Sequence, residues 1–115
     1  MIEKVILDYL NSNEKIKAPV KMEIPKDCPS KIYILEKTGG AMSNHVYHST
    51  FVVQSISKDS RYDASDLNEA VIHEMVYGLI ECPDIVGVTL NSNYDFTDTT
   101  TKRYRYQAVF DVVHY

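Results

Sequence analysis

Side-chain oxygens recur at short intervals over one stretch in the second half of the chain. The residues concerned are Asn91, Asn93, Asp95 and Asp98. Alternating Asn and Asp side chains can supply calcium ligands, but this stretch lacks the Gly and the terminal bidentate Glu of an EF-hand loop. We interpret 91–101 as a long solvated loop, and a loosely held divalent ion between subunits is the alternative.

Basic and aromatic residues interleave directly after this stretch. Lys102, Arg103 and Arg105 alternate with Tyr104 and Tyr106. Such a mixture can bind nucleic acid through phosphate contacts and base stacking. The alternative is a charged strand end that keeps a sheet edge from aggregating.

Histidines occur twice in patterns that resemble metal sites. His73 and Glu74 begin a zinc-protease motif, but Tyr77 stands where the second His is required. His45 and His48 are three residues apart. If both lie on the third strand they point to opposite faces and cannot share a metal, whereas a metal site is the alternative if the preceding loop extends through them. The chain also has no Gly-rich phosphate loop and no recognisable nucleophile motif. The sequence therefore predicts a protein that is not an enzyme, with no catalytic residue, cofactor or metal.

Length and composition are those of an ordinary globular protein. The 115 residues predict a single domain over 1–115, and 44% of them are hydrophobic and 24% charged. The net charge of −4 argues against nonspecific nucleic-acid binding by the whole surface. No apolar run approaches the roughly 20 residues of a membrane span, and no export signal is visible. We expect no membrane association, a cytoplasmic location, and reduced, inert thiols at Cys28 and Cys82.

The C-terminal stretch from Tyr104 alternates strictly between two sides of a strand. Tyr104, Tyr106, Ala108, Phe110 and Val112 fall on one side, and the residues between them fall on the other. The stretch has no Gly or Pro. We expect this strand to lie inside the sheet, with the other strands built around it.

The remaining elements follow from periodicity and breaker residues. The expected elements are a helix from Ile2 that ends near Asn11–Asn13, strands over 20–24, 31–37 and 46–57, a helix with Ser65 as its N-cap that stops at Glu81, and strands over 85–90 and from Tyr104 onward. The nearly continuous apolar centre of the second strand, Ile32–Leu35, indicates burial on both sides, with a partner subunit as a candidate cover. We expect Thr38-Gly39-Gly40 to break this strand, and a close packing contact at Gly78. The order is helix-strand-strand-strand-helix-strand-strand. It predicts an α+β fold with about five strands in an antiparallel or mixed sheet and two helices packed on one face.

Short blocks spread over nearly the whole chain carry a family resemblance. The blocks are Ile34–Gly40, Asn44-His45, Phe51–Ser55, Asp66–Ala70, Leu90–Asp98 and Lys102–Asp111. In this order they resemble the small tail terminator, or tail-to-head joining, proteins of long-tailed phages and of prophages in Gram-positive bacteria. The match is to ordered blocks and not to a catalytic signature.

The resemblance implies a homo-oligomeric ring, of six subunits, that caps the tail tube and joins it to the head connector. DNA would pass through the ring without sequence specificity. Assembly would take place in the host cytoplasm, and the ring would then lie at the head-tail junction of the virion. A neck or head-completion protein and a small nucleic-acid-binding module are the alternatives.

A ring built from head-to-tail contacts needs two different surfaces on each subunit. We expect the loops over 41–44 and 91–101 to provide them. The candidate interface or channel residues are Asn91, Asn93, Asp95, Asp98, Lys102, Arg103 and Arg105. The basic residues among them could pair with an acidic segment such as Asp59–Asp66 of a neighbour, or could face DNA.

Overall fold

The computed structural model describes residues 2–97 and 103–115, so the predicted site residues Asp98 and Lys102 lie outside the described residues. The elements are α1 (Ile2–Asn11), β1 (Val20–Lys21), β2 (Lys31–Ser43), β3 (Val46–Ser57), α2 (Arg61–His73), β4 (Ile85–Asp95) and β5 (Tyr104–His114). A π-helical turn, η1 (Glu74–Gly78), and a 3₁₀ turn, η2 (Leu79–Glu81), continue α2. The expected α+β fold and element order are confirmed.

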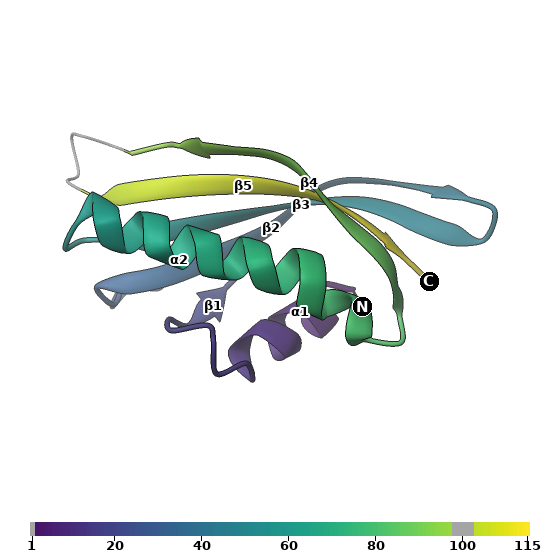
Figure 1. The fold of residues 1–115 in the computed structure, drawn as a ribbon, viewed down its shortest axis with the longest axis horizontal. Helices are drawn as coiled ribbons and strands as arrows, with labels where there is room; N and C mark the ends of the chain where they lie inside the picture. Colours follow the sequence, from purple (N-terminus) through teal and green to yellow (C-terminus); the bar gives the residue numbers. More distant parts are fainter. Residues whose placement is uncertain (1, 98–102) are drawn as a thin grey trace.

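The five strands form one mixed sheet in the order β1-β2-β3-β5-β4. β1 pairs parallel to β2, and the other neighbours are antiparallel. β5 lies between β3 and β4, as its uninterrupted alternation predicted (Figure 1). Ala108, Phe110 and Val112 are buried on one face of β5, and the residues between them are only half-buried. The alternation arises because successive side chains of a strand point to opposite faces.

Both helices lie on the same face of the sheet, and α2 runs along the strands (Figure 1). One apolar cluster contains Ile6 and Leu10 of α1, Leu67 and Val71 of α2, and Phe110 of β5. The core thus lies between the sheet and the two helices, as the sequence predicted.

β2 is buried on both faces near its start, which the continuous apolar run predicted. Tyr33 enters the main core, where its hydroxyl donates a hydrogen bond of 2.6 Å to the carbonyl oxygen of Leu67. Ile32, Ile34 and Ile56 form a second cluster on the opposite face, and Cys28 packs against it. The chain itself covers this cluster, where the sequence had suggested a partner subunit.

The expected break at Thr38-Gly39-Gly40 and the expected loop over 41–44 are wrong. β2 continues to Ser43, with a β-bulge between Lys37 and Gly39 that absorbs the glycines. Asn44 and His45 make the turn to β3, with φ angles of 51° and 66°. Two successive positive φ angles are the geometry of the tight type I′ hairpin turn, which explains why the strands continue to the tip. We call residues 38–48 the hairpin arm.

The second helix begins earlier than predicted, at Arg61. Its N-cap is Ser60, whose side-chain oxygen accepts a hydrogen bond of 3.0 Å from the backbone N–H of Asp63, so the expectation that Ser65 is the N-cap is wrong. The helix reaches Glu81 as expected, although its last two turns are π and 3₁₀. A Cβ at Gly78 would collide with the Tyr9 hydroxyl of α1. The expected close packing at this glycine is confirmed.

Candidate assembly surfaces

The predicted loop over 91–101 is strand as far as Asp95, because β4 pairs with β5 along its whole length. Asn91 lies at an irregularity of β4 between Leu90 and Ser92. Its side-chain nitrogen donates to a carboxylate oxygen of Asp111 at 3.0 Å. Asp111 alternates with the buried residues of β5, so this contact is on the sheet face opposite the helices.

Asn93 faces the helix side instead. Its side-chain oxygen accepts a hydrogen bond of 2.7 Å from Asn68, which is only 2% exposed on α2. The side chains of Asn91 and Asn93 therefore lie on opposite faces of the sheet and do not form one set of ion ligands. Asn93 instead links β4 to the helix that covers the core.

Asp95 lies at the end of β4 and is held by its own chain. Its carboxylate accepts hydrogen bonds from the hydroxyl and the backbone N–H of Thr97, and it pairs with Arg61 at 3.2 Å. The hydroxyl of Thr97 is the main reason that the pKa of Asp95 lies below its ordinary value, and the charge of Arg61 adds to the effect. Sequence analysis predicted Asp95 but not these partners.

Arg105 at the start of β5 and Arg61 at the start of α2 pack against aromatic rings of the same chain. The guanidinium carbon of Arg105 lies 5.9 Å from the ring centre of Phe96, and that of Arg61 lies 5.8 Å from the ring centre of Tyr104. Arg103 is half-buried just before β5 begins. The structure thus brings Arg105 close to Asp95 at one end of the sheet, where they line one shallow pocket.

The segment that carries acidic residues 59–66 lies at this same end within one chain. Ser57 of β3 pairs with Tyr104 of β5, and Arg61 from that segment binds Asp95. The predicted pairing of Arg103 and Arg105 with this segment of a neighbouring subunit stays a prediction.

Both outer edges of the sheet have unpaired backbone groups along most of their length. β4 is the last strand of the sheet and pairs only with β5 among the described residues. β1 covers β2 only at Tyr33 and Ile34, which leaves the edge from Leu35 to Ser43 open within the described part of the chain. Sequence reasoning missed these edges because it ended both strands too early.

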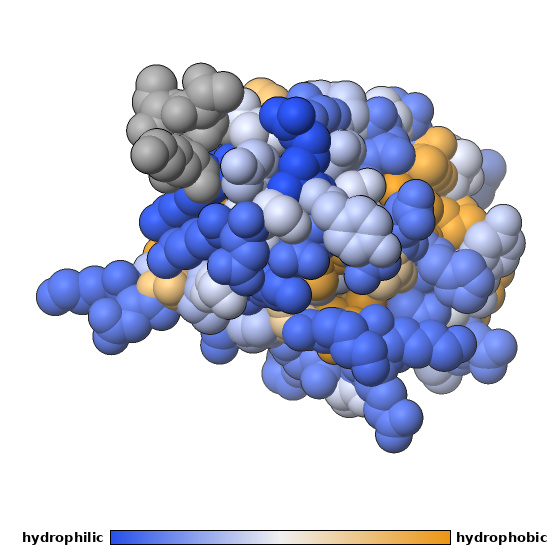
Figure 2. Space-filling view, turned by 60° about the vertical axis from the view of Figure 1, so that its left-hand side comes forward, coloured by the Kyte–Doolittle hydropathy of each residue, from blue (hydrophilic) through white to orange (hydrophobic). Residues whose placement is uncertain are grey.

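Exposed apolar side chains accompany each open edge. We define the β4 margin as the β4 edge with Ile80, Glu81, Asp84, Val86 and Leu90, and the β2 margin as the open β2 edge with Lys21, Met22, Ile24, Lys37 and Met42. Exposure is 49% at Ile80 and 43% at Val86 on the first margin, and 63% at Met42 on the second. Figure 2 shows one face of the molecule, on which apolar surface is visible between the polar side chains.

The histidine patterns form no metal site within the described ranges 2–97 and 103–115, where no three metal-ligating side chains gather. His73 contacts the Glu74 carboxylate at 3.2 Å, and Asn13 donates to the other carboxylate oxygen. Burial raises the pKa of Glu74, but these hydrogen bonds outweigh it and hold the pKa below its ordinary value. Glu74 therefore fastens the loop after α1 to η1. No described helix is long and apolar enough to span a membrane.

Comparison with known proteins gives a likeness of fold. No protein-family model matches the chain, and no curated protein matches it. A chain in the solved structure of the virion of a native gene transfer agent particle is similar, with a TM-score of 0.64 and 16% sequence identity. The similarity covers 85% of this chain and 78% of that chain. At this level of identity it establishes that the two chains share a fold.

Proposed function

We propose that this protein is a structural, non-enzymatic component of a phage-type virion. More specifically, we propose a tail terminator, which caps the tail tube and joins it to the head. The fold that it shares with a chain of the gene transfer agent virion supports the general role. The ordered sequence blocks that resemble tail terminators support the specific one.

The observation that carries the proposal is the pair of open strand edges, along β4 and along β2 from Leu35 to Ser43, on opposite sides of one sheet. A subunit with two different, complementary binding surfaces associates head to tail. The assembly forms a closed ring if the rotation between neighbouring subunits divides a full turn. Natural monomeric proteins rarely leave two long strand edges uncovered. In the proposed ring, of six copies, each edge would be protected by a neighbour.

The sheet face opposite the helices is suited to a DNA channel in this proposal. Gln54 lies opposite Gln107, and Val52 lies opposite Val109, across β3 and β5. Amide and valine side chains provide no charge for phosphate groups, and the opposite charges of Asp111 and Arg105 on the same face offset each other, so DNA would slide past without strong or sequence-specific binding. Ring assembly would take place in the host cytoplasm, before the ring enters the head-tail junction beside the tail-tube and connector proteins.

The test is deletion of the gene from the phage or prophage, followed by induction and negative-stain imaging. We expect filled heads beside unattached tails of abnormal length, because nothing would stop tube polymerisation. Filled heads beside free tails of normal length would instead indicate a neck or head-completion role. Normal, fully assembled particles would overturn the proposed function.

A further inference from the structure

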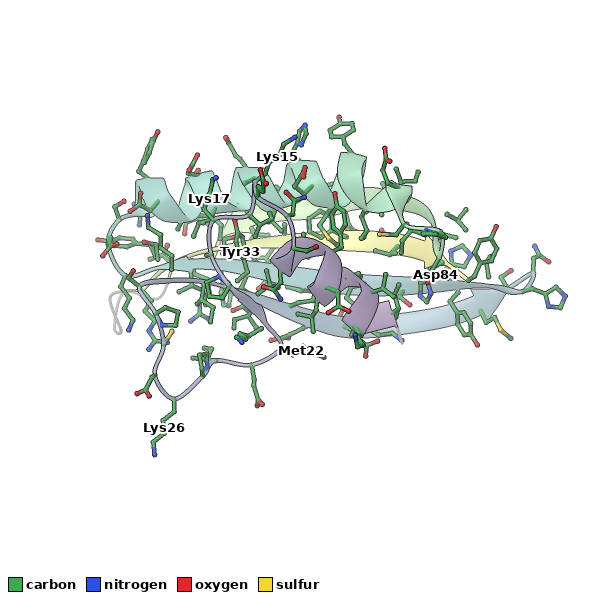
Figure 3. The ribbon with its side chains drawn as sticks, turned by 90° about the horizontal axis from the view of Figure 1, so that it is seen from below. Lys15, Lys17, Met22, Lys26, Tyr33 and Asp84 are labelled. Atoms are coloured by element: carbon green, nitrogen blue, oxygen red, sulfur yellow. The ribbon has the colours of Figure 1, made fainter. Side chains whose placement is uncertain are left out.

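We infer that residues 22–30 form a strap that opens locally, while the sheet stays folded, and so uncovers three buried isoleucines. The strap is the connection between β1 and β2. Figure 3 shows its course from Met22 to Lys26 on the side of the sheet opposite α2. The inference goes beyond the proposed function and does not depend on it. The burial, the hydrogen bonds and the length of the strap support it.

The parallel pairing of β1 and β2 explains why the strap crosses the sheet. Two parallel neighbours cannot be joined by a tight hairpin turn, so their connection passes over one face of the sheet. The helices cover one face, and Cys28 of the strap packs on the second apolar cluster on the other face. The members of this cluster, which are only 0–2% exposed, are Ile32, Ile34 and Ile56. The strap is therefore a cover for these side chains.

The strap itself buries very little. None of its residues is buried, and only Pro25 and Cys28 are half-buried. Its larger apolar side chains, Met22 and Ile24, are 42% and 44% exposed, so their burial does not hold the strap closed. Segments with few buried apolar contacts open locally at a free energy well below that of global unfolding.

Hydrogen bonds attach the strap to the body only near its C-terminal end. The Lys58 ammonium donates to the carbonyl oxygen of Cys28 at 3.0 Å. The backbone N–H of Lys58 donates to the carbonyl oxygen of Ser30 at 2.9 Å. Residues 22–27 make no backbone hydrogen bond to any other part of the chain that the structure describes. Lys58 therefore provides the polar contacts that hold the strap closed.

The strap is also longer than the path that it must bridge. Lys21 at the end of β1 lies beside Ile34, so the chain must return past three residues of β2 and cross to the neighbouring strand. That path is about 10 Å along the strand and about 5 Å across it. The nine residues 22–30 span about 30 Å when extended. This slack allows the strap to lift while β1 stays paired with β2.

Opening of the strap changes the character of the sheet face opposite the helices. The outer surface of the closed strap carries exposed charged side chains, among them Glu23, Lys26 and Asp27. The surface beneath it consists of isoleucine side chains. Because exposed apolar patches promote association, the closed strap limits association through this part of the face. The strap thus switches the face between a more polar and a more apolar state.

The experiment observes the isoleucine methyl groups of the full-length protein by NMR. A soluble paramagnetic probe broadens the signals of methyl groups that become exposed, and relaxation dispersion detects opening on the microsecond-to-millisecond timescale. We expect both effects at Ile32, Ile34 and Ile56. Ile6, a fully buried residue of the main core, should show neither effect.

Two variants should increase opening. Lys58→Ala removes the ammonium that binds the carbonyl oxygen of Cys28, and it should raise the open population about three- to tenfold. Cys28→Ala reduces packing on the second cluster and should raise the open population at least about threefold.

Each variant has a matched control elsewhere in the chain. Lys17→Ala changes an exposed lysine that Figure 3 places on the side of the sheet that carries α2. Cys82→Ala changes a half-buried cysteine that packs on the main core. Neither control should change the probe effect at Ile32, Ile34 or Ile56.

The inference is overturned if the three isoleucines stay as protected from the probe as Ile6 in every variant. It is also overturned if they lose protection only together with Ile6, since that result means global unfolding. An equal effect of Lys17→Ala and Lys58→Ala would overturn it as well. The Ile6 signal keeps local opening distinct from loss of the fold, and Lys58→Ala tests the strap without touching the packed cluster.

Discussion

Two regions of the chain differ in how they are packed. One is the contact between α1 and the end of α2, which we call the seam, and the other is the hairpin arm. At the seam, Tyr9 fills the space above Gly78, and Asn13 hydrogen-bonds the buried carboxylate of Glu74. Along the arm, the side chains from Thr38 to His45 are all exposed. At the seam, polar groups are hydrogen-bonded and apolar groups are packed within the chain, whereas the polar and apolar side chains of the arm are exposed to solvent.

This difference indicates which part of the molecule folds by itself and which part needs a partner. A two-stranded hairpin without packing is at best marginally stable in water. The arm extends from a five-stranded sheet and is anchored by it, but its outer edge is open. We therefore expect substitutions in the body to change the free energy of unfolding, and substitutions in the arm to change assembly.

The largest effect on stability should come from Phe110→Ala. Phe110 is fully buried beneath the helices, and its truncation leaves a cavity that the packed core cannot fill. We expect a loss of about 3–5 kcal/mol in the free energy of unfolding, measured by denaturant titration. Met42→Ala in the arm is the control and should change it by less than about 0.5 kcal/mol. Similar losses for both variants would show that the arm is packed after all.

Glu74→Gln should have the next largest effect, and the effect should depend on pH. The side chain is buried and accepts hydrogen bonds from Asn13 and His73, so we expect a loss of about 1–3 kcal/mol at neutral pH. Because the folded pKa lies below the unfolded value of about 4.3, the ionised carboxylate stabilises the fold above that pH. This contribution is lost as the pH falls through the folded pKa.

Thermal unfolding of Glu74→Gln and of the unmodified protein between about pH 3 and pH 7 checks this prediction. The difference between the two proteins should shrink toward the acid end. Glu69→Gln, at an exposed carboxylate of α2, is the matched control and should be nearly neutral. A difference that stays constant with pH would contradict an ionised role for Glu74.

Ser60→Ala should cost about 1 kcal/mol, because it removes the N-cap hydrogen bond to the N–H of Asp63. Ser65→Ala provides a matched comparison inside α2. This second change removes no N-cap and replaces serine with a better helix former, so it should be neutral or slightly stabilising. Chemical denaturation of both variants distinguishes the observed helix start from the one that the sequence suggested.

The smallest effect on stability should come from His45→Gly in the arm. Asn-Gly is the preferred pair for a type I′ turn, and His45 has a positive φ angle that glycine adopts without a steric penalty. We expect a change of less than about 0.5 kcal/mol in global stability, with slower amide hydrogen exchange in the arm. Faster exchange at the tip would contradict the assigned turn.

Much of the fold could be predicted from the sequence because its signals are local. The strict alternation from Tyr104 predicted a strand inside the sheet, and the apolar run Ile32–Leu35 predicted burial on both faces. The element order was enough to predict an α+β fold. The strand ends were predicted wrongly where residues that usually interrupt a strand lie inside one. These places are the bulge after Lys37 and the polar half of β4 from Asn91 to Asp95.

The predicted site residues were found, but their partners were not. Asn91 and Asn93 are two residues apart in a strand, and the irregularity between Leu90 and Ser92 places them on opposite faces. No local pattern encodes that irregularity. The pairing of Asp95 with Arg61 joins residues 34 positions apart, which becomes visible only when β3 and β5 bring their ends together.

The sequence by itself determined which residues are apolar and at what spacing, and hence the helices, most strands and the sheet-on-helix layering. It also determined the excess of negative charge in the second half of the chain. Only the tertiary structure decided which strands lie at the edges and which side chains beside them stay exposed. Strand order and edge position depend on pairings between residues far apart in sequence, and local propensity contains no information about those pairings.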